Sequence, residues 1–255
     1  RELILVAQDP TAYGEDWGRP GAICELLDRL QEIDGIRWIR ILYAYPERIS
    51  DAFIAAMVRN TKVVPYLDLP IQHCDDAVLK AMNRRGGRKE IEDAIARLRA
   101  AIPGITLRTT LIAGFPGETE EQYAELCDFV KTVRFDRLGC FAYSAEENTV
   151  AAKMPNQIDE ETKQRRADHI MELQAEVSAE REGEKVGHTY ECICDGVDDE
   201  TGMYLLRTKA DCPEIDGNVL TPADTPLETG AFYKVTITDS DTYDLYGYAE
   251  ERLED

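Results

Sequence analysis

The chain has 255 residues, 44% of them hydrophobic and 31% charged, which describes a folded globular protein with room for one large core and a small second domain. No apolar run reaches the roughly 18 residues of a membrane-spanning helix, so a membrane protein of that kind is excluded. The net charge of −21 argues against long-range attraction to nucleic acid or anionic membranes and favours a basic partner, although acidity for solubility alone explains it equally well.

The start of the chain and its cysteines bear on where the protein works. The chain lacks an initial Met, opens on a strand-like pattern and carries no signal peptide, so we expect a fragment whose true start lies upstream. An odd number of cysteines without a CxxC spacing is typical of reduced thiols in a cytoplasmic protein. The seven cysteines stand at positions 24, 74, 127, 140, 192, 194 and 212.

Apolar segments typical of strands alternate with helical patterns over the first 143 residues. Five successive strand-containing units predict an α/β fold with a parallel sheet, either open or closed into a barrel. The expected strands cover residues 3–7, 38–43, 63–69, 105–113 and 138–143, and the expected helices cover residues 22–33, 50–59, 76–82, 89–101 and 119–132.

The sequence changes character near Gly187. A long amphipathic helix is predicted over residues 159–185, and the short strand patterns after it predict a small β-barrel. We therefore expect two domains, residues 1–186 and 187–255. The second carries 4 Lys and Arg against 17 Asp and Glu, a net charge of −13, whereas the first carries 25 against 33, a net charge of −8. The expected barrel strands are residues 189–194, 203–207, 218–220, 231–238 and 246–249.

The segment Thr110-Leu-Ile-Ala-Gly-Phe-Pro-Gly-Glu-Thr119 is the most informative of the chain. It begins as a strand, breaks at Gly114, Pro116 and Gly117, and re-enters order as a helix at Thr119-Glu-Glu-Gln122, which fits a capping box. Loops at the carboxyl ends of parallel strands carry the chemistry of α/β enzymes. This loop therefore predicts one wall of an active site.

Three of the expected strands end in a pair of residues that could face a ligand, at the edge where a site of this fold would open. Each pair either faces a ligand or only begins a turn, and a lone histidine is more often a structural residue than a catalyst. The pairs are Gln8-Asp9, Gln72-His73 and Tyr143-Ser144.

Arg108 and Thr110 share one face of the fourth strand. A charge inside a sheet is costly unless it is paired or bound to a ligand, so Arg108 predicts either an internal ion pair or a ligand contact. Glu118 is either a ligand contact or part of the first turn of the next helix. The run Arg84-Arg-Gly-Gly-Arg88 lacks the spacing of a phosphate loop and is expected to link two helices.

Taken together, these segments resemble the radical SAM methylthiotransferases. The matching segments follow the family's order and cover nearly the whole chain. They are Leu5-Val-Ala-Gln-Asp9 with Tyr13-Gly14, Tyr66-Leu-Asp-Leu-Pro-Ile-Gln-His73, Val78-Leu-Lys-Ala-Met-Asn-Arg84, Thr110-Leu-Ile-Ala-Gly-Phe-Pro-Gly-Glu-Thr119, and Arg134-Phe-Asp136 leading to Phe141-Ala-Tyr-Ser144.

The resemblance implies a partial (β/α) TIM-like barrel of radical SAM type followed by a small all-β TRAM barrel. It implies a 4Fe–4S cluster that cleaves S-adenosylmethionine to a 5′-deoxyadenosyl radical, which abstracts hydrogen from an unactivated carbon. A second 4Fe–4S cluster would supply sulfur for methylthiolation. By resemblance, the cofactor cavity is lined by Gln8, Gln72, Arg108, Thr110, Gly114, Glu118 and Tyr143, and the substrate contacts are Asp9, His73 and Ser144.

The chain departs from the family pattern in three ways. The CxxxCxxC that binds the cluster in the family is absent, and in the family it lies just upstream of the strand that opens this chain. The N-terminal domain with the second cluster is also missing. We therefore assign no metal ligand here and expect the chain alone to be inactive. Asn148 stands where the family usually has Gly, at a position expected to need a positive φ.

Within the family, Gln72-His73 and the loop Tyr143-Ser-Ala-Glu-Glu147 resemble the branch that methylthiolates the β-carbon of an aspartate in a small-subunit ribosomal protein. The acidic second domain suits such a basic partner and would repel the tRNA that the sister branch modifies. Two alternatives stay open, namely tRNA adenosine methylthiolation and, in another class, a non-catalytic docking module for a ribosomal protein. An ordinary phosphate-binding barrel enzyme is disfavoured because the Gly-rich phosphate loop is missing.

Overall fold

The computed structural model describes residues 1–224 and 226–254. Within them, β1–β5 form a sheet in the order β1-β2-β3-β4-β5, and every neighbouring pair is parallel. Because β1 and β5 lie at the two edges, the sheet is open, and the predicted α/β class with a partial barrel is confirmed. The strands are β1 Glu2–Leu5, β2 Trp38–Ile41, β3 Val63–Asp68, β4 Thr106–Ala113 and β5 Arg137–Ala142.

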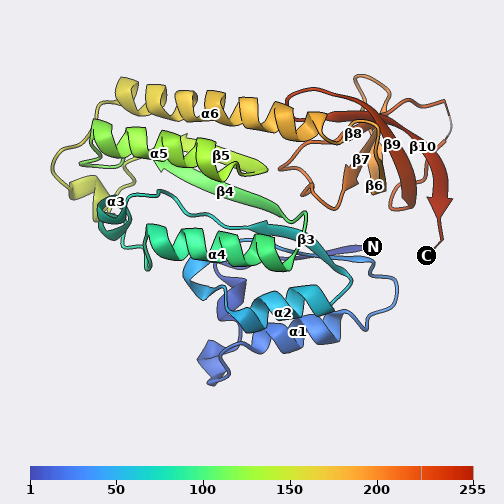
Figure 1. Ribbon diagram of the computed structural model, residues 1–255, viewed down its shortest axis with the longest axis horizontal. Helices are drawn as coiled ribbons and strands as arrows, with labels where there is room; N and C mark the ends of the chain where they lie inside the picture. The colour runs from blue at the N-terminus through green and yellow to red at the C-terminus, as the bar shows by residue number, and fades with distance from the viewer. Residues whose placement is uncertain (225, 255) are drawn as a thin grey trace.

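Helices connect these strands and cover one face of the sheet (Figure 1). The Gly-rich run at residues 84–88 joins α3 to α4, as predicted. None of the helices within the described residues has the length and apolar character needed to cross a bilayer. The α-helices are α1 Ala22–Leu30, α2 Asp51–Arg59, α3 Asp76–Ala81, α4 Arg88–Ala101, α5 Glu120–Val133 and α6 Glu160–Gly183, and the 3₁₀ turns are η1 Pro10–Ala12, η2 Glu15–Trp17, η3 Pro46–Arg48 and η4 Ala151–Lys153.

Side-chain caps start several helices. The Ser50 hydroxyl accepts a hydrogen bond from Phe53 N at 3.1 Å at the start of α2. The capping box predicted at α5 is confirmed, because Thr119 Oγ1 accepts from Gln122 N at 3.3 Å and Gln122 Oε1 accepts from Thr119 N at 2.9 Å. These bonds satisfy backbone N–H groups that have no partner inside the helix. They fix where α5 leaves the Gly-Pro loop.

Alternation along the strands gives the sheet two different faces. Residues such as Ile39, Leu67 and Leu107 point toward the helices and form the main hydrophobic core. The opposite face, here called the barrel-side face, carries Trp38, Leu42, Val64 and Tyr66 under the second domain and Arg108, Thr110 and Ile112 along β4.

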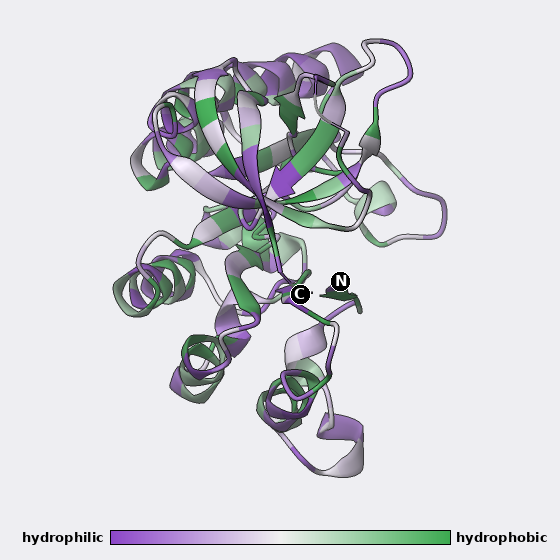
Figure 2. Ribbon diagram, turned by 90° about the vertical axis from the view of Figure 1, so that its right-hand side faces the viewer, coloured by the Kyte–Doolittle hydropathy of each residue, from purple (hydrophilic) through white to green (hydrophobic). Residues whose placement is uncertain are grey.

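A closed barrel follows α6, as the short strand patterns predict. Its strands run in the order β10-β8-β7-β6-β9, and hydrophobic residues alternate with hydrophilic ones along them (Figure 2). The inward residues, among them Cys192, Leu206 and Val235, form a separate small core. The strands are β6 Thr189–Val197, β7 Tyr204–Thr208, β8 Val219–Thr221, β9 Phe232–Ser240 and β10 Leu245–Leu253.

The barrel packs against the amino half of the barrel-side face. The rings of Trp38 and Phe232 meet edge to face, with centroids 4.9 Å apart. Trp38 Nε1 donates to Glu191 Oε1 at 2.8 Å, and Arg40 donates to the Lys209 carbonyl at 3.0 Å. The carboxyl half of the same face is left open, where Phe141 is 62% exposed. The fold therefore leaves an accessible surface at the edge where the sequence predicts the site.

Candidate active site

The first strand delivers two of the predicted site residues to the carboxyl edge. Gln8 is exposed just beyond β1. Asp9 is half-buried, and its carboxylate accepts from Thr11 N at 3.0 Å and pairs with Arg48 Nε at 2.7 Å. Asp9 therefore caps η1 and holds this turn beside η3. Gln8 is the freer of the two to meet a ligand.

Gln72 has a left-handed backbone, with φ of 69°. Its N–H donates to the Thr110 carbonyl at 2.9 Å, and its own carbonyl accepts from Ile112 N at 2.8 Å. The chain thus continues the ladder with β4 past the end of β3. A non-glycine residue pays for a positive φ with strain, and such strain gathers at functional sites. The left-handed backbone therefore places Gln72 at the carboxyl edge of the sheet.

His73 and Glu118 form a buried pair rather than an open one. Asp75 N donates to His73 Nδ1 at 2.9 Å, so the proton of the neutral ring lies on Nε2. This Nε2 lies 3.4 Å from Glu118 Oε2 without forming a hydrogen bond. Arg166 donates to Glu118 Oε1 at 2.7 Å. The His73 and Glu118 side chains are both fully buried, so this network can hold the loop in place.

Gly114 lets α6 approach the loop. Its φ is 77°, and a Cβ at this position would lie 2.5 Å from Lys163 Cγ and 3.0 Å from Lys163 Cα. Its N–H is 3.1 Å from both Glu118 carboxylate oxygens. The glycine is required twice, because the backbone is left-handed and because α6 occupies the space of a side chain.

The sequence left open whether Arg108 forms an internal ion pair or contacts a ligand, and in the structure it forms ion pairs. One guanidinium nitrogen lies 3.1 Å from Asp68 Oδ1, and Nε lies 3.5 Å from Asp216 Oδ1 on the loop before β8. Tyr66 donates its hydroxyl proton to Asp216 Oδ2 at 2.7 Å. Burial raises the pKa of Asp68, although Arg108 opposes that shift. The ion pair with Asp216 connects Arg108, at the bottom of the site, to the barrel. Thr110 lies two residues further along β4, on the same face and nearer the open carboxyl edge.

Tyr143 lines a cavity of about 650 Å³ at the end of β4 and β5. Its side chain is 8% exposed, and its hydroxyl has no hydrogen-bond partner among the described residues. The ring meets Phe115 edge to face at 5.2 Å. A buried hydroxyl without a partner is a position that a ligand or water would satisfy. Gln72, Ile112 and Met154 also line this cavity. Ser144 lies outside it, where it is exposed and its hydroxyl donates to Glu146 at 2.9 Å.

Tyr43 and Phe141 also belong to this edge, and sequence reasoning missed them. Tyr43 has a φ of 61°, and its N–H donates to Asp68 Oδ2 at 3.2 Å. Phe141 pairs in register with Ile112 and shares its face of the sheet. Alternation along the strand could have shown which residues share a face with Phe141, whereas its register with Ile112 is visible only in the structure. Tyr43 gave no signal, because its conformation depends on Asp68 from another strand.

The cysteines do not fit an iron–sulfur cluster. Within residues 1–224 and 226–254, no group of three or more His, Cys, Asp and Glu side chains could hold a metal ion. Burial raises the pKa of Cys74 to about 12 and that of Cys140 to about 12, so both are poor sources of thiolate. No reaction step through a cluster is therefore assigned to these residues.

The chain matches two known families. Residues 1–130 match the Radical SAM superfamily, and residues 186–249 match the TRAM domain. The fold resembles coproporphyrinogen III oxidase (HemN) from Escherichia coli, a radical SAM enzyme, with a TM-score of 0.51 at 20% identity. That match covers 61% of this chain and 37% of the other. At this identity the likeness shows the fold alone.

Curated relatives are similar over nearly all of the chain. It is 46% identical over 253 residues to the ribosomal protein uS12 methylthiotransferase RimO of Pelobacter propionicus, a match covering 99% of this chain and 56% of the relative. The RimO of Desulforamulus reducens is 46% identical over 248 residues, covering 97% and 56%. The chain thus spans a little over half the length of these relatives. Because the superfamily match extends over more than half of the chain, this protein belongs to the radical SAM superfamily.

Proposed function

We propose that this chain is part of a RimO-like methylthiotransferase that modifies the β-carbon of an aspartate in a small-subunit ribosomal protein. The observation that carries the proposal is the 46% identity, over 99% of the chain, to a relative named for ribosomal protein uS12. Since the chain spans 56% of that relative, the activity is proposed for a longer protein. We keep the division into residues 1–186 and 187–255, and a cytoplasmic location, as part of the proposal.

Superfamily membership implies S-adenosylmethionine and a 4Fe–4S cluster, and the resemblance adds a second cluster. S-adenosylmethionine, when bound, supplies the radical chemistry. The open half of the barrel-side face fits this cofactor, because Ile112 and Phe141 offer apolar contact and Gln72 and Thr110 offer polar groups. Gln8 would border the same surface. The protein's task there is to bind, orient and exclude water.

The remaining predicted residues support this surface in different ways. We propose that Gly114, Glu118 and His73 act by holding the Gly-Pro loop, since the two side chains are buried and engaged. Arg108 would form the floor, held by Asp68 and Asp216. Tyr143, whose hydroxyl has no partner among the described residues, would join Gln8, Gln72 and Thr110 in contacting the cofactor. Asp9, which pairs with Arg48, and Ser144, which donates to Glu146, would border the substrate at the rim.

The charge distribution supports a basic protein partner. The second domain carries a net charge of −13 in the sequence, and many of those carboxylates are exposed, most of them on the loops between the barrel strands. Such a surface attracts a basic ribosomal protein and repels phosphate backbones. tRNA is therefore the less favoured partner.

A chimeric enzyme tests the proposal. This chain would replace the matching residues of the Pelobacter propionicus relative, so that the relative's own residues complete the protein. After anaerobic reconstitution with iron and sulfide, we expect cleavage of S-adenosylmethionine and addition of one methylthio group to an aspartate of uS12, measured by peptide mass spectrometry. The variant Tyr143→Phe should lower turnover, while Tyr248→Phe, on the exposed side of β10, should not.

The rival functions give different results in the same assay. Methylthiolation of tRNA adenosine in place of uS12 would establish the sister activity. Cleavage of S-adenosylmethionine by the parent relative but not by the chimera, with uS12 binding retained, would favour a docking module. Binding of uS12 should weaken as salt rises, because opposite charges drive it.

A further inference from the structure

A second cleft lies far from the carboxyl edge, where the amino ends of β4 and β5 meet the end of α6 and the start of the barrel. It has a volume of about 670 Å³. Its walls bring together cationic side chains from α4, β5, α6 and the turn after α6, and a histidine before β6, beside the carboxylates of Asp136, Glu182 and Glu184, in a chain whose net charge is −21. The cationic residues and the histidine are Arg99, Arg137, Arg181, Lys185 and His188.

Two of the guanidinium groups are held side by side. Arg99 and Arg181 both donate to the Arg134 carbonyl, at 3.0 and 3.2 Å, where α5 ends. Burial lowers the pKa of Arg99, Asp136 offsets part of that shift, and the nearby charge of Arg181 lowers it further. Capping of α5 explains one donor, but it does not explain two like charges brought to the same oxygen.

The carboxylate nearest this pair is already engaged. Asp136 Oδ2 accepts from Leu107 N at 2.9 Å, and its Oδ1 lies 3.7 Å from Arg181 Nε, beyond hydrogen-bond distance. Arg181 Nε is buried and has no hydrogen-bond partner in the part of the chain that the structure describes. Asp136 balances part of the charge of the pair, and Glu182 and Glu184 also line the cleft, so the feature that favours an anion is the unpartnered Arg181 Nε–H and not an excess of positive charge.

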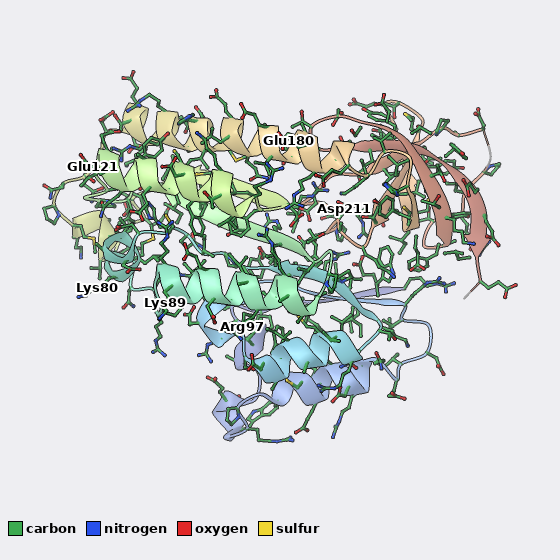
Figure 3. All side chains as sticks on the ribbon, in the orientation of Figure 1. Lys80, Lys89, Arg97, Glu121, Glu180 and Asp211 are labelled. Carbon is green, nitrogen blue, oxygen red and sulfur yellow. The ribbon has the colours of Figure 1, made fainter. Side chains whose placement is uncertain are left out.

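Arg137 adds a third donor at the wall of the cleft. Its side chain is 8% exposed, and its terminal nitrogens pair with Glu182 and Asp211. Figure 3 shows Asp211 between α6 and the barrel. Arg137 Nε, in contrast, is buried without a hydrogen-bond partner among the described residues. Leaving a buried charged donor unpaired is unfavourable, so this N–H favours an added acceptor.

We propose that this cleft binds a phosphate group, with Arg99, Arg181 and Arg137 Nε as donors. A phosphate dianion presents several acceptor oxygens, and guanidinium groups bind such oxyanions through charge-assisted hydrogen bonds. The strongly negative chain disfavours anions elsewhere, so binding requires this local arrangement. Free inorganic phosphate and the phosphates of a small nucleotide share this chemistry. The site lies away from the proposed active site and does not depend on the proposed function.

Titration of the isotopically labelled chain with inorganic phosphate or ADP tests the proposal, with sodium chloride at matched ionic strength as the reference. We expect saturable shifts of the Arg Nε–H signals, with a dissociation constant of about 1 mM. Similar affinities would identify the phosphate group itself as the ligand, and tighter binding of ADP would identify a nucleotide. Equal shifts in chloride, or no saturable shift with either ligand, would overturn the site.

Three variants localise the binding. Arg99→Gln and Arg181→Gln should each weaken it at least about tenfold, the effect of losing one charge-assisted hydrogen bond. Arg97→Gln is the matched control, because Arg97 lies on the same helix but pairs with Asp93 and Asp51 outside the cleft (Figure 3). An equal loss in that control would contradict the site. Phosphate should also raise the melting temperature of the unmodified chain more than chloride does, a readout that needs no variant.

Discussion

Gly114 is the residue on which the approach of α6 to the Gly-Pro loop depends. The variant Gly114→Ala would place a methyl group 2.5 Å from Lys163 Cγ and also strain a φ of 77°. We expect a loss of about 2–4 kcal/mol in the free energy of unfolding, from overpacking and backbone strain together. Urea denaturation followed by circular dichroism measures this loss.

Gly117 separates the two causes. It lies in the same loop with a φ of 86°, but nothing lies within 4 Å of an added Cβ. Gly117→Ala should therefore cost only the strain, about 1 kcal/mol. Equal losses in the two variants would show that contact with Lys163 contributes nothing.

Single residues show what the sequence could and could not predict. The positive φ of Asn148, 66°, follows from the residue type that the family prefers there. The partners of Arg108 could not be foreseen, since Asp216 lies in another domain and nothing in the sequence couples the two. Likewise, the burial of Glu118 depends on Arg166 arriving from α6. Local conformation is encoded locally, whereas the partner of a charge is decided by packing.

At the scale of elements, the capping box of α5 fixes the helix that leaves the site. Thr119→Ala removes the bond that Thr119 Oγ1 accepts from Gln122 N and should lower the free energy of unfolding by about 1 kcal/mol. Thr132 lies near the other end of α5, where its hydroxyl donates to the Asp128 carbonyl. Thr132→Ala should change stability by less than about 0.5 kcal/mol. Thermal unfolding of both variants checks the difference, and similar losses would contradict a specific role for the cap.

The helices and strands could be predicted from the sequence more readily than the candidate site. Period-two and helical patterns located the strands and helices, because each element buries a stripe of its own residues. The cavity beside Tyr143 draws on α3, the end of β4 and η4, which meet only in the folded chain. Its existence could not be predicted from any one segment. The partner-free Tyr143 hydroxyl, the strongest sign of a ligand there, is visible only in the structure.

For the whole molecule, the docking of the barrel decides which half of the barrel-side face stays open. Ion pairs at the junction, such as Arg207 with Glu2 at 2.8 Å and Arg37 with Glu191 at 2.9 Å, surround the apolar contact of Trp38 with Phe232. The barrel thereby covers the amino half and limits ligands to the carboxyl half. The acidic barrel is thus both a candidate docking surface and a structural part of the site.

Glu191 makes this junction sensitive to acid. Burial by itself raises the pKa of Glu191, but hydrogen bonds from Arg37 and Trp38 outweigh it and hold the pKa below its ordinary value of 4.5. A carboxyl whose pKa is lowered by folding stabilises the fold above the unfolded pKa, and that contribution is lost as the pH falls through the folded pKa. Glu191→Gln should therefore lower the free energy of unfolding by about 1–2 kcal/mol at neutral pH. The difference should stay constant down to pH 4.5 and shrink below it.

Trp38 reports this junction directly, since its ring nitrogen donates to Glu191. In a Trp17→Phe background, which removes the exposed second tryptophan, urea unfolding followed by fluorescence should show the Glu191→Gln loss at about pH 7 and little of it at about pH 3. Glu176→Gln, on the exposed side of α6, is the control and should change neither curve. A Glu191→Gln loss of the same size at both pH values would mean that the charge of Glu191 does not stabilise the junction.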